Sequence, residues 1–215
     1  MTKGDIIANE NTENYLGTAC CILSSASNPL QSYLLTCNHV MTGNNFDSPG
    51  ALGGNAIKLI SGDAILIGTW QRGLMDDTMD AAIISLDPLE LNDPNNISQP
   101  VYTVTESDCS VTLVEMAGAI SGLRQAFIID IGQLIDVDYD NGTIQMSGLI
   151  TLSADTNPAN FTPVTVKGDS GALVYHAGTL QPIAMVIGAN QQFTFALPIT
   201  DVLNSFPELN LSINP

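Results

Sequence analysis

Short apolar runs separated by turn residues recur along the whole chain, and this spacing constrains the fold more than any other feature. The runs occupy residues 15–23, 32–36, 56–60, 64–70, 81–86, 101–105, 110–116, 126–137, 143–152, 161–166, 172–176, 183–188 and 193–198. Many short strands between regular turn signals are typical of a β-sandwich or barrel. Because no long amphipathic helix and no strand–helix alternation is visible, the sequence predicts an all-β fold, with one short helix over residues 199–204.

A segment rich in proline and asparagine, residues 87–100, interrupts the strand pattern near the middle of the chain. Such a composition disfavours regular structure and is typical of a connection. The 215 residues suffice for one large domain or two small lobes, and a hydrophobic content of 45% allows a sizeable core. We therefore interpret residues 87–100 as the crossing between two lobes.

The net charge limits the kinds of partner that the protein is expected to bind. Five Lys and Arg residues stand against 22 Asp and Glu residues, which gives a formal charge of −17. Phosphate backbones and anionic membrane surfaces repel such a protein, so we expect neither nucleic acid nor a membrane as a partner. The first ten residues lack the apolar region of a secretory signal, and this favours a cytoplasmic location.

The four cysteines, Cys20, Cys21, Cys37 and Cys109, show no CxxC pattern and no cysteine–histidine ligand spacing. Zinc is therefore disfavoured, and buried free thiols fit a reducing compartment. The acidic run 136–142 imitates the start of a calcium-binding loop. However, its glycine comes one place late and serine replaces the closing glutamate, so we expect an acidic hairpin there. We expect no metal and no cofactor.

One block has the composition of a reactive serine site. Ser170 follows an acid, lies between Gly168 and Gly171, and precedes an apolar run in the segment KGDSGALV. Glycines permit a sharp turn that can aim successive backbone N–H groups at one point, as an oxyanion hole requires. An ordinary Gly-Asp-Ser-Gly turn between strands is the alternative, because these are common turn residues.

A serine hydroxyl is a weak nucleophile and needs a base that is poised near neutral pH. Of the two histidines, His39 follows an apolar strand in LLTCNHV, whereas we expect His176 at the surface or near a hairpin. Asp80 stands at the start of another apolar strand in MDAAII. An unpaired charge would be costly there, and a buried carboxylate commonly holds the imidazole of such a base.

These three blocks, in this order, resemble the signature blocks of the chymotrypsin/trypsin-like serine proteases. The intervals resemble the spacing in that family, since 80 − 39 = 41 and 170 − 80 = 90 residues. The small-residue strand GTACCI, which precedes the histidine block, also resembles its counterpart. The resemblance extends over residues 15–205, and three ordered motifs are far more specific than any one of them.

The resemblance implies a role for each matching residue. Ser170 resembles the nucleophile, His39 the general base and Asp80 the acid that orients it. The backbone N–H groups of Gly168 and Ser170 resemble the oxyanion hole, and Asp169 resembles the acid that steadies it. In zymogen members that acid pairs with a new N-terminus. Here Ile6 lies too close to the first matching strand for such activation to be favoured, and the sequence names no other partner for Asp169.

The fold implied is a pair of six-stranded antiparallel β-barrels with the site in the cleft between them. Residues 1–95 would carry the histidine and the aspartate, and residues 96–215 would carry the serine and the oxyanion hole. Val40 occupies the position where many members have a disulfide-bonded cysteine, so the chain resembles bacterial-type members without disulfides. The implied substrate is a polypeptide, and a partner protein could control activity.

The family resemblance also places a substrate pocket. Its wall and base would be formed by Val164, Thr165, Val166, Ile187, Gly188 and Ala189. None of these is acidic, and residues 183–188 lack the histidine that is common in Glu-specific members. We therefore expect a small or medium apolar residue at the cleaved position. Two alternatives to a serine endopeptidase stay open: a catalytically silent protease-like binding module, and an acyl or ester hydrolase on the same site.

Overall fold

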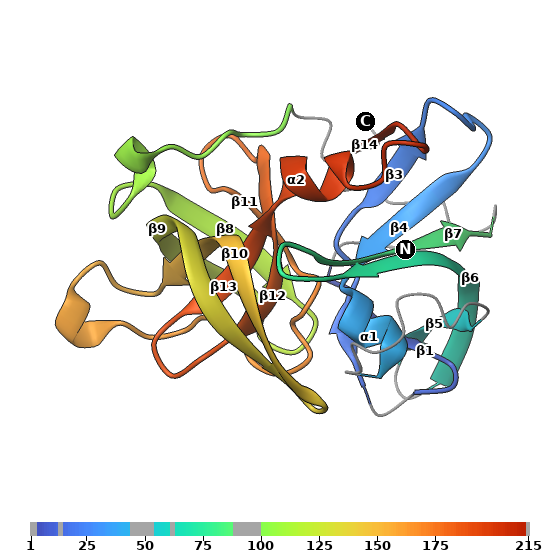
Figure 1. Ribbon diagram of the computed structural model, residues 1–215, viewed down its shortest axis with the longest axis horizontal. Helices are drawn as coiled ribbons and strands as arrows, with labels where there is room; N and C mark the ends of the chain where they lie inside the picture. The colour runs from blue at the N-terminus through green and yellow to red at the C-terminus, as the bar shows by residue number, and fades with distance from the viewer. Residues whose placement is uncertain (1–3, 13–14, 44–53, 61–62, 88–99, 214–215) are drawn as a thin grey trace.

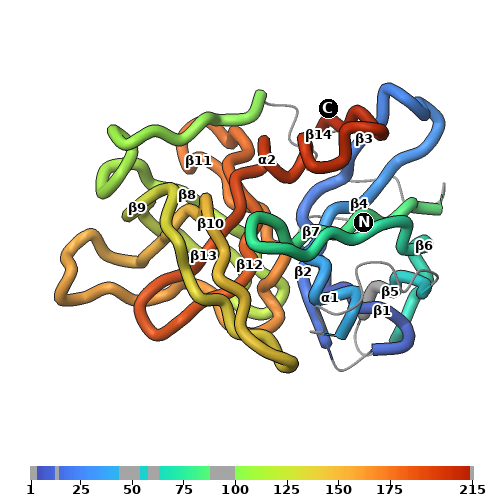
Figure 2. The backbone as a smooth tube through the Cα atoms, in the orientation of Figure 1, coloured from blue at the N-terminus to red at the C-terminus, as the bar shows by residue number. Residues whose placement is uncertain are grey.

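The computed structural model describes residues 4–12, 15–43, 54–60, 63–87 and 100–213. Its strands form two antiparallel sheets that lie side by side (Figures 1 and 2). We call the sheet built mainly from residues 6–86 the first lobe and the sheet built from residues 113–198 the second lobe. Most of the crossing predicted at residues 87–100 lies outside the described residues.

The first lobe is an eight-stranded sheet in the order β14-β3-β4-β7-β6-β5-β1-β2. Its strands are β1 (Ile6–Asn9), β2 (Gly17–Thr18), β3 (Ile22–Ser25), β4 (Ser32–Thr36), β5 (Asn55–Ile60), β6 (Asp63–Met75), β7 (Asp80–Leu86) and β14 (Leu211–Ile213). Six strands were expected. The count differs because the two-residue β2 pairs with β1 at one edge and the C-terminal β14 pairs with β3 at the other.

The second lobe closes into the predicted six-stranded barrel, in the order β10-β13-β12-β11-β8-β9. Its strands are β8 (Leu113–Gly118), β9 (Gly122–Tyr139), β10 (Gly142–Ser153), β11 (Leu173–His176), β12 (Pro182–Ala189) and β13 (Thr194–Pro198). The predicted short helix is α2 (Ile199–Asn204), which buries Ile199 and Val202 and leads the chain back towards the first lobe. No helix in the described ranges is long and apolar enough to cross a membrane.

Two runs that the sequence predicts as strands are not strands. Residues 101–105 lead irregularly into the short 3-10 helix η2 (Glu106–Asp108), and residues 161–166 follow η3 (Pro158–Asn160) without a ladder. In the second run, amides donate to side chains: Val164 N to Thr194 Oγ1 and Val166 N to Asp169 Oδ2. Apolar composition alone does not distinguish backbone held in this way from backbone in a sheet.

Apolar packing joins the two lobes. The larger core cluster combines first-lobe residues such as Leu35 and Ile83 with second-lobe residues such as Met146 and Phe195, all buried. A smaller cluster, which includes Val114 and Val174, fills the second barrel. The interface between the two lobes is therefore part of the main hydrophobic core.

Asp108 stabilises the start of the second lobe. Its carboxylate accepts bonds from the Tyr102 hydroxyl at 2.7 Å, the Thr112 hydroxyl at 2.7 Å and the Thr105 amide at 2.8 Å. Burial acts to raise the pKa of Asp108, but the hydrogen bonds from Tyr102, Thr105 and Thr112 outweigh it and lower the pKa to about 2. The folded state therefore favours the ionised form.

We expect Asp108→Asn to lower the free energy of unfolding by about 1–2 kcal/mol at pH 7. A carboxyl whose pKa is lower in the folded state stabilises the protein above its unfolded pKa. That stabilisation is lost as the pH falls from about 4 to about 2. Urea unfolding of both proteins across this range measures the difference, which should shrink towards zero. A difference of constant size would contradict this assignment.

Candidate active site

The strand register brings His39 and Asp80 together. In the first lobe β4 pairs with β7, with Thr36 opposite Ala82, so the end of β4 lies beside the start of β7. The chain then turns into the short helix α1 (Asn38–Thr42), which carries His39. His39 Nδ1 lies 2.6 Å from Asp80 Oδ2, and the His39 amide donates to Asp80 Oδ1 at 3.1 Å.

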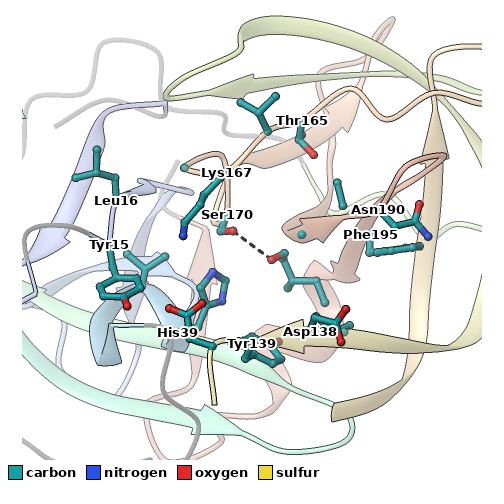
Figure 3. Close-up of a pocket in the computed structure, with 18 of the residues that line it drawn as sticks. Tyr15, Leu16, His39, Asp138, Tyr139, Thr165, Lys167, Ser170, Asn190 and Phe195 are labelled. Carbon is teal, nitrogen blue, oxygen red and sulfur yellow. Dashed lines mark hydrogen bonds between the residues drawn. The ribbon is translucent and has the colours of Figure 1, made fainter. Parts of the chain in front are cut away.

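The pair has the geometry of a base and its orienting acid. Asp80 is fully buried, whereas the His39 side chain is 13% exposed. Because a carboxylate accepts from Nδ1, the proton of the neutral imidazole resides there and Nε2 is left as the basic nitrogen. His39 and Ser170 both line the cleft shown in Figure 3.

Ser170 lies in a tight loop of the second lobe that docks on the first. Gly168 and Gly171 have φ values of +103° and +98°, a region that favours glycine. The Thr18 amide donates to the Ser170 carbonyl at 2.8 Å, and the Thr18 hydroxyl donates to the Gly168 carbonyl at 2.9 Å. A single threonine of β2 therefore holds the serine loop against the first lobe.

The same loop leaves two backbone donors unused. Within the described part of the chain, the N–H groups of Gly168 and Ser170 donate to no acceptor, whereas the amides of Asp169 and Gly171 are bonded to Val166 and Val186. The Ser170 hydroxyl donates to the Ile187 carbonyl at 3.2 Å rather than to His39 (Figure 3).

The structure identifies the partners of Asp169, which the sequence did not. The fully buried carboxylate accepts from the amides of Ile120 at 2.9 Å and Ser121 at 3.0 Å, and from the Val166 amide at 2.9 Å. The Ser121 hydroxyl is a fourth donor. Neutral donors, two of them amides of the β8–β9 turn, therefore hold this acid.

We expect Asp169→Asn to destabilise the protein by about 2 kcal/mol or more, because an amide cannot accept charge-assisted bonds from all four donors. Activity should fall as well, since Asp169 fixes the loop between Gly168 and Ser170. Urea unfolding and peptide cleavage measure the two effects. The exposed Asp63→Asn is the matched control and should change stability by less than about 0.5 kcal/mol. Equal effects of the two substitutions would contradict this role of Asp169.

A cleft of about 460 Å³ between the lobes contains the candidate catalytic groups. Of the residues predicted for the site, those that line it are His39, Thr165, Val166, Gly168, Ser170, Ile187, Gly188 and Ala189. Asp80 and Asp169 lie buried behind this surface. The structure does not bring Val164 to the cleft: it lines a different hollow with Leu123 and Pro163.

Other residues that line the cleft were not predicted from the sequence as part of the site. They include Tyr15, Leu16, Lys167, Asn190, Phe195 and the hairpin residues Asp136, Asp138, Tyr139 and Asp140. The acidic run 136–142 forms the expected hairpin, with Tyr139 opposite Gly142. Tyr139 donates its hydroxyl to Asp80 Oδ2 at 2.9 Å, a contact across 59 positions that no local signal could indicate.

The second histidine, His176, stabilises a turn. The ring of His176 accepts from the amides of Gly178 and Thr179 at 3.1 and 3.2 Å in the turn after β11. This confirms the expectation of a residue beside a hairpin. The four cysteines form no disulfide, and all except Cys109 are buried.

The closed barrel, the curved first sheet and the cleft between them define the chymotrypsin-like double β-barrel fold, which confirms the predicted fold class. Solved structures that resemble the chain over nearly its whole length include proteases, one of them described as a glutamic acid specific serine protease. No model of a known protein family matches the sequence, and no curated protein does.

Three of these structures show the extent of the likeness. Protease A of Thermobifida fusca is 20% identical, with a TM-score of 0.62, and the match covers 96% of this chain and 97% of that one. The Nocardiopsis protease is 17% identical, with a TM-score of 0.63 and coverages of 100% and 98%. The chymotrypsin of Cellulomonas bogoriensis is 15% identical, with a TM-score of 0.61 and coverages of 100% and 99%.

Proposed function

We propose that the chain is a serine endopeptidase that acts through an acyl-enzyme intermediate, with Ser170, His39 and Asp80 as its triad. The observation that carries the proposal is the combination in one cleft of an Asp80-bound imidazole, a serine hydroxyl and two unused backbone donors. The similarity of the fold to bacterial serine proteases supports it, and so does the order of the three sequence blocks.

In this mechanism His39 Nε2 takes the proton of Ser170 as Oγ attacks the carbonyl carbon of the scissile bond. The negative oxygen of the tetrahedral intermediate accepts bonds from the N–H groups of Gly168 and Ser170. His39 then gives the proton to the leaving amine, and the acyl group stays on Ser170. Water, activated by the same imidazole, hydrolyses the ester, while Asp80 stabilises the imidazolium in both halves of the reaction.

We propose a small or medium apolar residue at the cleaved position. Apart from Val164, the pocket residues expected from the sequence line the cleft, where Thr165, Val166, Ile187, Gly188 and Ala189 offer no formal charge. Phe195, which is 5% exposed, also lines this cleft and limits the size of the side chain that fits. A polypeptide is the proposed substrate.

Incubation with an unfolded protein and a peptide library, followed by mass spectrometry, tests the proposal. Wild type should cut after small or medium apolar residues, and Ser170→Ala should cut nothing. Hydrolysis of simple esters without peptide cleavage would instead indicate an acyl hydrolase on the same site. If wild type cleaves neither peptides nor esters, the endopeptidase proposal is wrong.

One observation favours a second candidate, a catalytically silent protease-like binding module. The Ser170 hydroxyl donates to Ile187 and not to His39, which is the arrangement of a resting or inactive serine. Hydrogen bonds in unliganded active sites are often formed only when substrate binds, so we favour the enzyme. A cytoplasmic location and control by a partner protein stay predictions.

A further inference from the structure

The buried carboxylate of Asp80 depends on hydrogen-bond donors from neighbouring residues. Its side chain has no exposure to solvent, and a buried carboxylate is tolerated only when donors satisfy its oxygens. His39 supplies two of these donors, its amide to Oδ1 and its ring to Oδ2. The third is the Tyr139 hydroxyl, which also bonds to Oδ2, the oxygen that holds the imidazole.

Tyr139 reaches Asp80 from the other lobe. It ends the 18-residue strand β9, whose hairpin with β10 extends from the second barrel towards the first lobe (Figures 1 and 2). The hairpin is attached near Asp80 a second time, because the Ser147 amide donates to the Asp77 carbonyl at 2.8 Å. Alternation along β9 turns Val137 and Tyr139 inwards, where each is 8% exposed.

The tyrosine ring also contacts the imidazole. The ring centroids of Tyr139 and His39 lie 5.6 Å apart with an interplanar angle of 60°, an edge-to-face contact that limits rotation of the base (Figure 3). Burial, followed by the charge of Asp80, raises the pKa of Tyr139 far above its usual value. The hydroxyl is therefore a neutral donor throughout the pH range in which a histidine base works.

We propose that Tyr139 is a positioning residue of the triad, whose hydroxyl fixes the Asp80 carboxylate so that Oδ2 stays aligned with His39 Nδ1. The proposal rests on the function proposed above. In this arrangement a hairpin of the second lobe, which also carries Ser170, determines the orientation of the His39 imidazole in the first lobe. Free rotation of the carboxylate would let the imidazole leave its reactive position.

Tyr139→Phe tests the proposal because it removes the hydroxyl and keeps the ring. We expect kcat for a peptide substrate to fall about tenfold to a hundredfold, the range typical of a hydrogen bond to a charged group, with KM changed less than about twofold. Tyr102→Phe is the matched control. It removes a tyrosine hydroxyl that is also bonded to a buried aspartate, Asp108, but neither residue lines the cleft, and kcat should not change.

A double-mutant cycle with Asp80→Asn separates positioning from general stability. If Tyr139 acts through Asp80, Tyr139→Phe should lower kcat less than about twofold in the Asp80→Asn background. Equal fold-losses in both backgrounds would overturn the proposal, as would full activity of Tyr139→Phe.

Proton NMR tests the proposal without an activity assay. The hydrogen-bonded Nδ1 proton of His39 should be visible far downfield in wild type and should exchange faster with water in Tyr139→Phe. Unchanged exchange would overturn the role of Tyr139. By contrast, wild type with a normal Nδ1 proton and no reaction with substrate would refute only the proposed function.

Discussion

Replacing His39 with alanine is expected to lower kcat/KM for peptide cleavage by about 10⁴- to 10⁶-fold, with little change in KM. Without the imidazole the described part of the cleft has no histidine to take the proton of Ser170 at neutral pH. The carboxylates that line it, Asp136, Asp138 and Asp140, belong to the acidic hairpin. Progress curves with one peptide substrate, at enzyme concentrations high enough to detect the residual rate, measure the loss.

The chain supplies its own control, since its only other histidine is His176. His176→Ala removes an imidazole that bonds to its own turn and packs against Tyr102, and it should leave kcat/KM within about twofold of wild type. Similar losses in the two variants would mean that the assay reports folding and not the function of the base.

Gly171→Ala is expected to have the second large effect, a destabilisation of about 3–5 kcal/mol together with loss of activity. A Cβ at this position would lie 2.2 Å from the Thr18 carbonyl oxygen and 2.7 Å from Thr36 Oγ1, and the backbone has φ +98°. Since both neighbours belong to the first lobe, the loop that carries Ser170 would have to move away from it. Urea unfolding and peptide cleavage measure the consequences.

Gly132→Ala separates backbone strain from the steric clash. Gly132 also has a left-handed φ, +73°, but a Cβ added there would have no atom of the described residues within 4 Å beyond its own chain neighbours. This variant should lose only about 1 kcal/mol and keep its activity. If Gly171→Ala loses no more stability and activity than Gly132→Ala, the close approach of Gly171 to Thr18 is not the reason for the glycine.

Local sequence patterns sufficed for most of the strands and for the central groups of the site. The runs at 81–86 and 183–188 are strands because buried β-branched and apolar residues continue through them, and turn residues bound them. The runs at 101–105 and 161–166 were predicted wrongly, because their amides are satisfied by side chains and by distant carbonyls. Such partners depend on the folded structure and leave no mark on local composition.

The dependence on contacts that form only in the folded structure also explains which site residues were predicted and which were missed. His39, Asp80 and Ser170 were recognisable because each lies in a short motif beside a strand end. Tyr139 was not, because its contact with Asp80 depends on the length of the hairpin and on how the lobes pack. The partners of Asp169 were missed for the same reason, since two of the four donors are amides of the β8–β9 turn.

The central claim is that an imidazole of the first lobe activates a serine of the second. A fluorophosphonate tests it most directly: Ser170 Oγ would attack phosphorus, fluoride would leave, and His39 would accept the proton. Intact-mass and peptide mapping between about pH 6 and 9 should place a single adduct on Ser170 in wild type and none in Ser170→Ala or His39→Ala. An unmodified Ser170 in wild type, or equal labelling of His39→Ala, would contradict the claim.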